Sequence, residues 1–445
     1  MQIVISIILS LLIVGLIIGT NAVILLNAKS YANPALVFSV FFGIQMLLCL
    51  LFLQEDIGGV YYGFFWIYAG VSAFALGSYL VSRRRSGEPK IVRSNGGAQT
   101  AKGYDVYDKK TMNITLAALL LLSFTQPISI IYRLGYNFID LFNPYMLFEM
   151  NHAAAQSRYV EHSNSGSPLM QIFLVLVYLL PLIGGWNFVY SKKRRTKILC
   201  VCMVLPSLFV LFTQNTKAAF IGSVLLFICS FITAKFQKSG SFYRLRAKRL
   251  RLIFLLAAVF LLLNYISFFL REGDVTWSLF GAISYKTFNY TLGQIPAFNH
   301  WLSNSFVLFP QTFGLKTLYS VTDSLGIMKR VQGIYPDKLV TAHLSTNVYT
   351  AFRPLIDDFS AIGALVVLFL TGALSGFCFG RLKAGTARCL DIAFITAMYF
   401  YIFYSFITSP WAYVSYTAAA VLFYCYLWLI RGHVIFVGRI KEPLI

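Results

Sequence analysis

Charge is scarce in this chain of 445 residues, and acidic residues are the scarcer kind. Charged residues make up 12% of the chain, against about 25% in soluble proteins, and 58% of its residues are hydrophobic. This composition excludes an ordinary soluble domain and predicts an all-α, polytopic integral membrane protein. The net charge of +21 does not indicate a nucleic-acid partner, because an excess of Lys and Arg in membrane proteins usually marks cytoplasmic loops.

Sequence signals for disulfides, metals and nucleotides are also missing. All seven cysteines fall within apolar segments or at their edges, so neither a disulfide framework nor a zinc site is indicated. The chain has no Gly-rich phosphate loop, no HExxH and no GxSxG. We therefore predict neither a metal nor a cofactor.

Long apolar runs dominate what is present. A helix needs roughly 17 to 25 apolar residues to cross a bilayer. A run at 198–234 is too long for one helix, and its polar centre TQNTK divides it in two. About eleven transmembrane helices, possibly twelve, are predicted within one transmembrane domain, 1–445. Their ranges are 3–26, 34–53, 61–81, 113–132, 168–190, 198–213, 216–234, 252–270, 360–380, 390–408 and 412–430.

The basic residues indicate the orientation. Most of the 37 Lys and Arg residues lie at 82–112, 192–197, 235–251, 381–388 and in the C-terminal tail, which alternate correctly if all of them face the cytoplasm. This predicts a cytoplasmic C-terminus. The N-terminal run is longer than a signal sequence allows, so we expect it to be a retained helix.

Two long segments then face away from the cytoplasm, 133–167 and 271–353. The first predicts an interfacial helix over 139–160. The second is too polar and too interrupted by Gly and Pro to span, yet it is too rich in aromatics for a disordered linker. Four of the five histidines lie in these two segments, so we expect the active site there and do not expect ATP or a nucleotide sugar as the direct substrate.

Three basic residues lie at the edge of an apolar run. Lys217 follows the polar run TQNT, Arg271 follows the apolar segment ending FFL, and Arg353 precedes Pro354. A charge near membrane depth is costly and often functional, although a snorkelling lysine or an interfacial anchor is the simpler explanation. Arg suits a diphosphate because its planar fork pairs with oxyanions.

Candidate bases and sugar-binding groups lie near Arg353. His343, Asp357 or Asp358 could accept a proton from an attacking hydroxyl, although acids beside a helix start also suit the macrodipole. His300 and Asn347 offer polar contacts. Trp301 and Tyr349 could stack on sugar faces, or they could seat the segment on the membrane interface.

At these residues the chain resembles the bacterial O-antigen polymerases, which join oligosaccharide repeat units. The likeness rests on TQNTKAAFIG, on FLREG followed by YTLGQIPAFNHWL, and on TNVYTAFRPLIDDFSAIGALV. Asn347, Arg353 and Asp358 match the third motif, whereas Lys217 stands where the family more usually has Arg. The related O-antigen ligases tend to carry a His-Asn pair, but Thr346 precedes Asn347 here.

The resemblance implies a GT-C-like, metal-independent glycosyltransferase. It would transfer a glycan from undecaprenyl diphosphate to a second undecaprenyl-diphosphate-linked repeat unit. The resemblance also implies a bacterial inner membrane, in which 133–167 and 271–353 are periplasmic loops and the active site faces the periplasm. Membrane lipids and a chain-length regulator protein would be further partners. Arg271, Arg353 and Lys217 would stabilise the leaving diphosphate. Two alternatives stay open: an O-antigen ligase, and a flippase or transporter of lipid-linked oligosaccharide.

Overall fold

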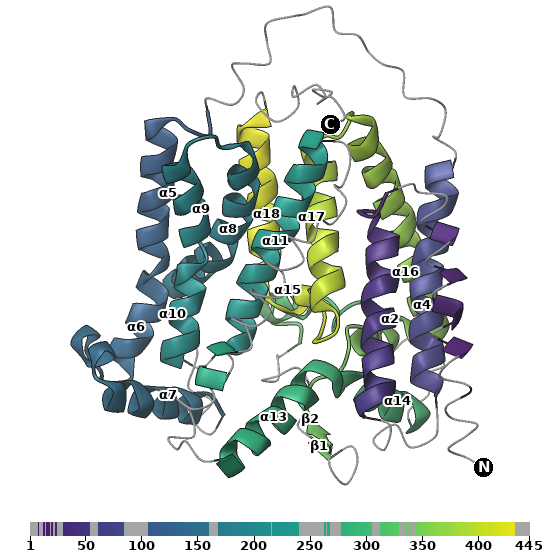
Figure 1. Ribbon diagram of the computed structural model, residues 1–445, viewed down its shortest axis with the longest axis horizontal. Coiled ribbons are helices and arrows are strands. Elements are labelled where there is room, and N and C mark those ends of the chain that lie inside the picture. Colours follow the sequence, from purple (N-terminus) through teal and green to yellow (C-terminus); the bar gives the residue numbers. More distant parts are fainter. Residues whose placement is uncertain are drawn as a thin grey trace, which may run out of the picture.

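The structure, a computed structural model, consists mainly of long helices that run side by side (Figure 1). Among the described residues the only sheet is an antiparallel pair, β1 (Lys338–Leu339) with β2 (Ser345–Thr346). The predicted all-α class is therefore confirmed. The description covers residues 30–53, 61–83, 106–159, 168–214, 216–239, 277–304, 312–328, 335, 338–339 and 344–431, with isolated residues at 8–24 and 262–267.

Helices fill both halves of the chain. The first half contains α2 (Pro34–Phe52), α4 (Tyr62–Arg83), α5 (Lys110–Ser123), α6 (Thr125–Arg133), η1 (Phe138–Phe142), α7 (Pro144–Tyr159), α8 (Pro168–Tyr190), α9 (Arg194–Cys202), α10 (Leu205–Gln214) and α11 (Lys217–Ser239). The second half contains α13 (Trp277–Leu292), α14 (Gln294–Asn304), α15 (Tyr319–Ser324), α16 (Phe352–Ala384), α17 (Cys389–Tyr404), η2 (Pro410–Ala412) and α18 (Val414–Leu429).

The apolar helices match the spans expected from hydropathy. Seven helical spans within the described residues are long and apolar enough to cross a membrane, and α17 and α18 are shorter apolar helices. The chain is thus a multi-pass helical membrane protein. The predicted spans 3–26 and 252–270 lie largely outside the described residues, so the total of eleven stays a prediction.

Two of the predicted spans are each broken by a proline. The span 113–132 is divided into α5 and α6, and 198–213 into α9 and α10. A proline cannot donate to the carbonyl four residues before it, and its ring clashes with that carbonyl. Pro127 and Pro206 stand four residues after Ser123 and Cys202, where α5 and α9 end.

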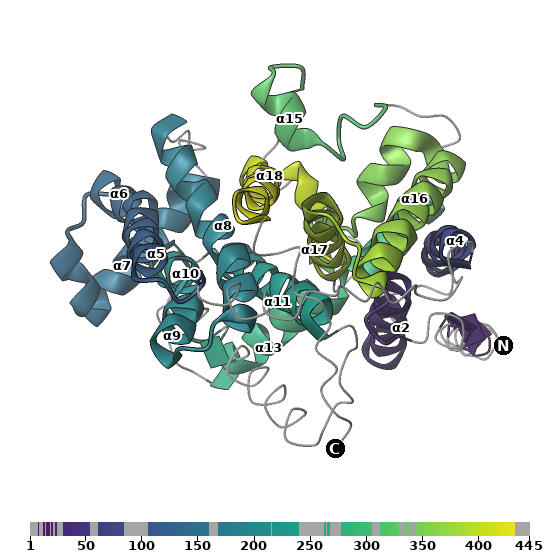
Figure 2. The same cartoon turned by 90° about the horizontal axis from the view of Figure 1, so that it is seen from above.

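Helix α17 joins two hydrophobic cores. One core is built mainly from α8, α11, α17 and α18 and includes Tyr399 and Phe400. The other is built mainly from α2, α4, α14 and α16 and includes Tyr401 and Ile402 of α17. Seen from above, α17 stands between α18 and α16 (Figure 2). Opposite faces of one helix therefore hold the two groups together.

The two ends of the bundle differ. The start of α5, the turn before α9 and the turn after α16, which carry basic residues, lie at the upper end in Figure 1. Helices α7, α13 and α14 and the β1–β2 pair lie at the lower end. Helix α7, at Pro144–Tyr159, coincides with most of the interfacial helix predicted over 139–160, and it runs across the direction of the long helices.

Glycines allow α4 and α16 to touch backbone to backbone. A Cβ added at Gly372 would overlap the carbonyl oxygen of Phe74, and one added at Gly77 would overlap that of Phe369. Gly376, one turn after Gly372, similarly faces Ser78. This is the small-xxx-small pattern by which membrane helices approach closely. The contact fixes where α16, and hence Arg353, stands.

Replacing Gly372 with alanine should destabilise the protein, because backbone atoms of α4 would have to move. Overpacking of this kind costs about 1–3 kcal/mol. The measurement is the thermal unfolding temperature in detergent. Gly380→Ala is the matched control, because a Cβ there meets nothing within 4 Å. An equal unfolding temperature for the two variants would contradict the close contact.

Candidate functional site

The start of α16 lies beside a turn that is sunk into the bundle from its lower end. Helices α17 and α18 have 16 residues each, so each rises about 24 Å, less than the roughly 30 Å of a hydrocarbon core. Figure 1 shows the turn between them above the level of α7, α13 and α14. The Ala351 amide donates to the Ser405 carbonyl at 2.7 Å, so α16 begins at this sunken level.

Three aromatic rings surround the guanidinium of Arg353. Its central carbon lies 3.8 Å from the ring centroid of Tyr335, 4.0 Å from that of Tyr349 and 5.0 Å from that of Trp301. All three distances are within the range of cation–π attraction. We call these four residues the Arg353 cage. The side chain is partly exposed, and its buried Nε has no hydrogen-bond partner among the described residues.

The cage is built on a small core of its own. Tyr335 and Tyr349 are buried with Ala297 of α14, Tyr319 of α15 and Ala412 of η2. Segments far apart in sequence therefore converge where α16 begins. The guanidinium carries five N–H donors, and the side chain is partly exposed. An anion could therefore accept from it.

Helix α16 is interrupted just after its two acids. Ser360 has φ 68° and ψ 170°, and its hydroxyl accepts from the Gly363 amide at 3.3 Å, so it caps the second part of the helix. Asp357 and Asp358 thus stand at the end of a short first part and not in a first turn. The macrodipole disfavours negative charge at that position. Both side chains are buried, so other groups must compensate them.

The Asp358 carboxylate holds the turn at 312–317. One of its oxygens accepts from the Thr312 hydroxyl at 2.5 Å and from the Lys316 amide at 3.0 Å. Its other oxygen accepts from the Thr317 amide at 2.6 Å. With both oxygens engaged, Asp358 is better suited to positioning this turn than to accepting a proton from substrate.

The Asp357 carboxylate binds the side chain that this turn carries. The Lys316 ammonium donates to Asp357 Oδ2 at 2.9 Å, and the Tyr335 hydroxyl donates to the same oxygen at 3.4 Å. Burial raises the pKa of Tyr335 well above its ordinary value, the charge of Asp357 raises it further, and Arg353 opposes the change. Tyr335 therefore keeps its proton and connects the caged cation to the carboxylate.

The structure brings some of the predicted site residues together. Arg353, Trp301, Tyr349 and Asp357 gather around Tyr335, and Asp358 is adjacent. Sequence reasoning missed Tyr335 and Lys316. Asp357 lies 22 residues from Tyr335 and 41 from Lys316, and neither partner stands at an apolar boundary that would have marked it.

The remaining candidates do not belong to the cage or lie outside the described residues. Asn347 follows β2 and is half-buried, and His300 of α14 pairs with Asn304 on its own helix at 3.2 Å. Lys217 is the first residue of α11, where the next carbonyl, of Ala218, accepts from Tyr416 of α18 at 3.2 Å. His343 and Arg271 lie outside the described residues, so their roles stay predictions.

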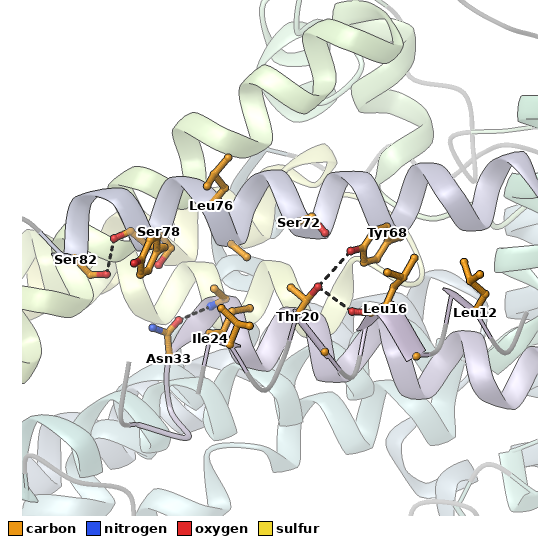
Figure 3. A pocket seen from close by; sticks show the side chains of 16 residues that line it. Leu12, Leu16, Thr20, Ile24, Asn33, Tyr68, Ser72, Leu76, Ser78 and Ser82 are labelled. Carbon is orange, nitrogen blue, oxygen red and sulfur yellow. Dashed lines mark hydrogen bonds between the residues drawn. The ribbon is translucent and has the colours of Figure 1, made fainter. Parts of the chain in front are cut away.

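A separate cleft of about 730 Å³ lies on the other side of α4 (Figure 3). It is lined by N-terminal residues from Leu12 to Ile24 and by α4 residues from Tyr68 to Ser82. The Thr20 hydroxyl lies 3.3 Å from that of Tyr68. Among the residues that the structure describes, no charged side chain lines this cleft, so we do not assign the chemistry to it.

Compared with known proteins, the chain matches no family model, no curated protein and no solved structure. The class that the fold defines is a multi-pass helical membrane protein. A more specific function has to be argued from the residues of the site.

Removing the Asp358 carboxylate should free the 312–317 turn. Hydrogen bonds to charged groups contribute about 1.5–3 kcal/mol each, so Asp358→Ala should speed amide exchange at Lys316 and Thr317 by about tenfold or more. Hydrogen exchange followed by mass spectrometry measures this. Asp323→Ala, which removes an exposed carboxylate from the same segment, should leave both rates near those of the wild type. Unchanged exchange in Asp358→Ala would contradict the assigned role.

Proposed function

We propose that the protein is an O-antigen polymerase, a glycosyltransferase that joins undecaprenyl-diphosphate-linked repeat units at the periplasmic face of the bacterial inner membrane. The observation that carries the proposal is the Arg353 cage. A partly exposed guanidinium, whose Nε has no hydrogen-bond partner among the described residues, lies close to a buried carboxylate. The sequence resemblance at TNVYTAFRPLIDDFS supports the same assignment.

Arg353 is assigned to the leaving group. The acceptor hydroxyl attacks the anomeric carbon of the donor, a glycosidic C–O bond forms, and the C–O bond to the diphosphate breaks. The electron pair of that bond stays on undecaprenyl diphosphate, whose charge Arg353 stabilises. Arg271 and Lys217 are proposed to add positive charge at the same anion. Cationic side chains serve here where other enzymes use a metal.

The proton of the acceptor hydroxyl goes to a carboxylate or to an imidazole. Asp357 is the better placed of the two acids, because its Lys316 partner is partly exposed and can move toward an incoming phosphate, whereas Asp358 is fully engaged. His343 stays the alternative base. We assign Trp301, Tyr349, His300 and Asn347 to the sugars and to the position of the cage.

The proposed orientation follows from the two ends of the bundle. Lys and Arg cluster in the described turns at the upper end in Figure 1, which favours the cytoplasm for that end, where α18 finishes. The site end, with α7, α13 and α14, then faces the periplasm. A lipid-linked sugar in the outer leaflet would meet the cage there.

A reconstituted assay tests the reaction directly. Purified protein in nanodiscs would receive a synthetic undecaprenyl-diphosphate-linked repeat unit, with a chelator present and no nucleotide sugar. We expect glycans of two or more repeat units and release of undecaprenyl diphosphate, both seen by mass spectrometry. Product attached only to added lipid A core would indicate a ligase instead. Movement of the intact substrate across the membrane without any new bond would indicate a flippase.

Arg353→Ala should lower the polymerisation rate by at least about 100-fold, the usual loss when one donor to a developing oxyanion is removed. Arg353→Lys should recover only part of the rate, because an ammonium can neither stack as a plane nor pair through two N–H groups. Arg194→Ala is the control: Arg194 is exposed at the opposite end of the bundle. Rates in Arg353→Ala like those of the wild type, at equal protein level, would remove the proposal.

A further inference from the structure

Residues 312–328 have two chemically different sides. Tyr319, Ser320 and Thr322 point inward and are buried. The outward side is apolar, with each member between 42% and 74% exposed: Phe313, Leu318, Val321, Leu325 and Ile327. We call these five residues the outer rim. Five exposed apolar side chains on one short segment are typical of a surface that contacts something other than water.

The inner contacts fix which side faces out. The Ser320 hydroxyl donates to the Trp411 carbonyl at 2.8 Å, and the Ser409 hydroxyl donates to the Thr317 carbonyl at 3.4 Å. Asp358 holds the preceding turn through two backbone amides. The segment is therefore bound along its inner side to η2 and α16. The outer rim cannot turn inward without breaking these bonds.

The depth of the segment identifies what covers the rim. Its partners η2 and the break in α16 belong to the sunken level set by the short helices α17 and α18. Figure 1 shows α15 at this level, above α7, α13 and α14, and Figure 2 shows it at the outer edge between α16 and α18. Both neighbouring helices also expose apolar side chains, such as Ile362 and Val421. A bilayer around these helices would cover such side chains, and at this level it would reach the rim as well.

We propose that the outer rim is embedded in the bilayer, with lipid hydrocarbon as its partner. Asp323 and Ser324 are exposed on the same segment, which places it at the boundary between hydrocarbon and headgroups and not at the bilayer centre. Irregular backbone is tolerated near this depth because protein groups satisfy its inner side. The rim is thus a membrane-contacting edge beside the Arg353 cage. It does not depend on the proposed reaction.

Electron paramagnetic resonance of a spin label tests the rim in full-length protein in liposomes. Oxygen concentrates in hydrocarbon, whereas a nickel chelate stays in water. The label would replace Leu325 or Val321 through cysteine, in a Cys425→Ser background, because Cys425 is the one exposed native cysteine among the described residues. Leu422→Cys on α18 gives the hydrocarbon reference, and Asn304→Cys at the exposed end of α14 gives the water reference.

We expect labels at 325 and 321 to collide with oxygen more than with the nickel chelate, with ratios on the Leu422 side of the midpoint between the two references. Ratios on the Asn304 side would overturn the proposal, because the rim would then face water. Low collision rates with both reagents would overturn it too, since another protein surface would then cover the rim. Each labelled variant must elute as the wild type does on size exclusion, and two positions guard against one poorly folded variant.

Discussion

Two adjacent buried carboxylates at the break in α16 constrain the whole site. A buried negative charge has to be compensated by hydrogen-bond donors or by a positive charge. Asp358 accepts hydrogen bonds from backbone amides of the 312–317 turn. Asp357 accepts one from the ammonium of Lys316 in the same turn. One turn is thus held through its backbone and its side chain together. The pair adds to the hydrogen bonds of Ser320 and Ser409, which hold α15 against η2.

The arrangement separates roles that neighbouring residues might otherwise share. The Asp358 carboxylate positions the 312–317 turn. Asp357 instead forms an ion pair with Lys316, whose side chain is partly exposed and can move away. Tyr335 connects Asp357 to the caged guanidinium, so cation and carboxylate are placed by one ring. For the proposed transfer, this would bring the leaving-group stabiliser and the proton acceptor to one place. Their common depth suits a substrate that arrives in the membrane.

The sequence predicted helices well and contacts poorly. Hydropathy located the spans because a bilayer demands long apolar runs, and the polar TQNTK correctly separated α10 from α11. Arg353 could be singled out because it stands where the chain re-enters an apolar run. Lys316 and Tyr335 could not, since their pairing with Asp357 depends on how a long segment folds back. The local sequence around Ser360 also contains nothing that predicts its positive φ.

The most direct test of the central claim is made in the host. The gene would be deleted and the lipopolysaccharide examined on a gel. We predict that the ladder of long chains disappears while a single repeat unit stays attached to the core, because ligation continues without polymerisation. Loss of every repeat unit would contradict the polymerase assignment and favour a ligase or a flippase. An unchanged ladder would also contradict the polymerase assignment, and it would favour a transporter.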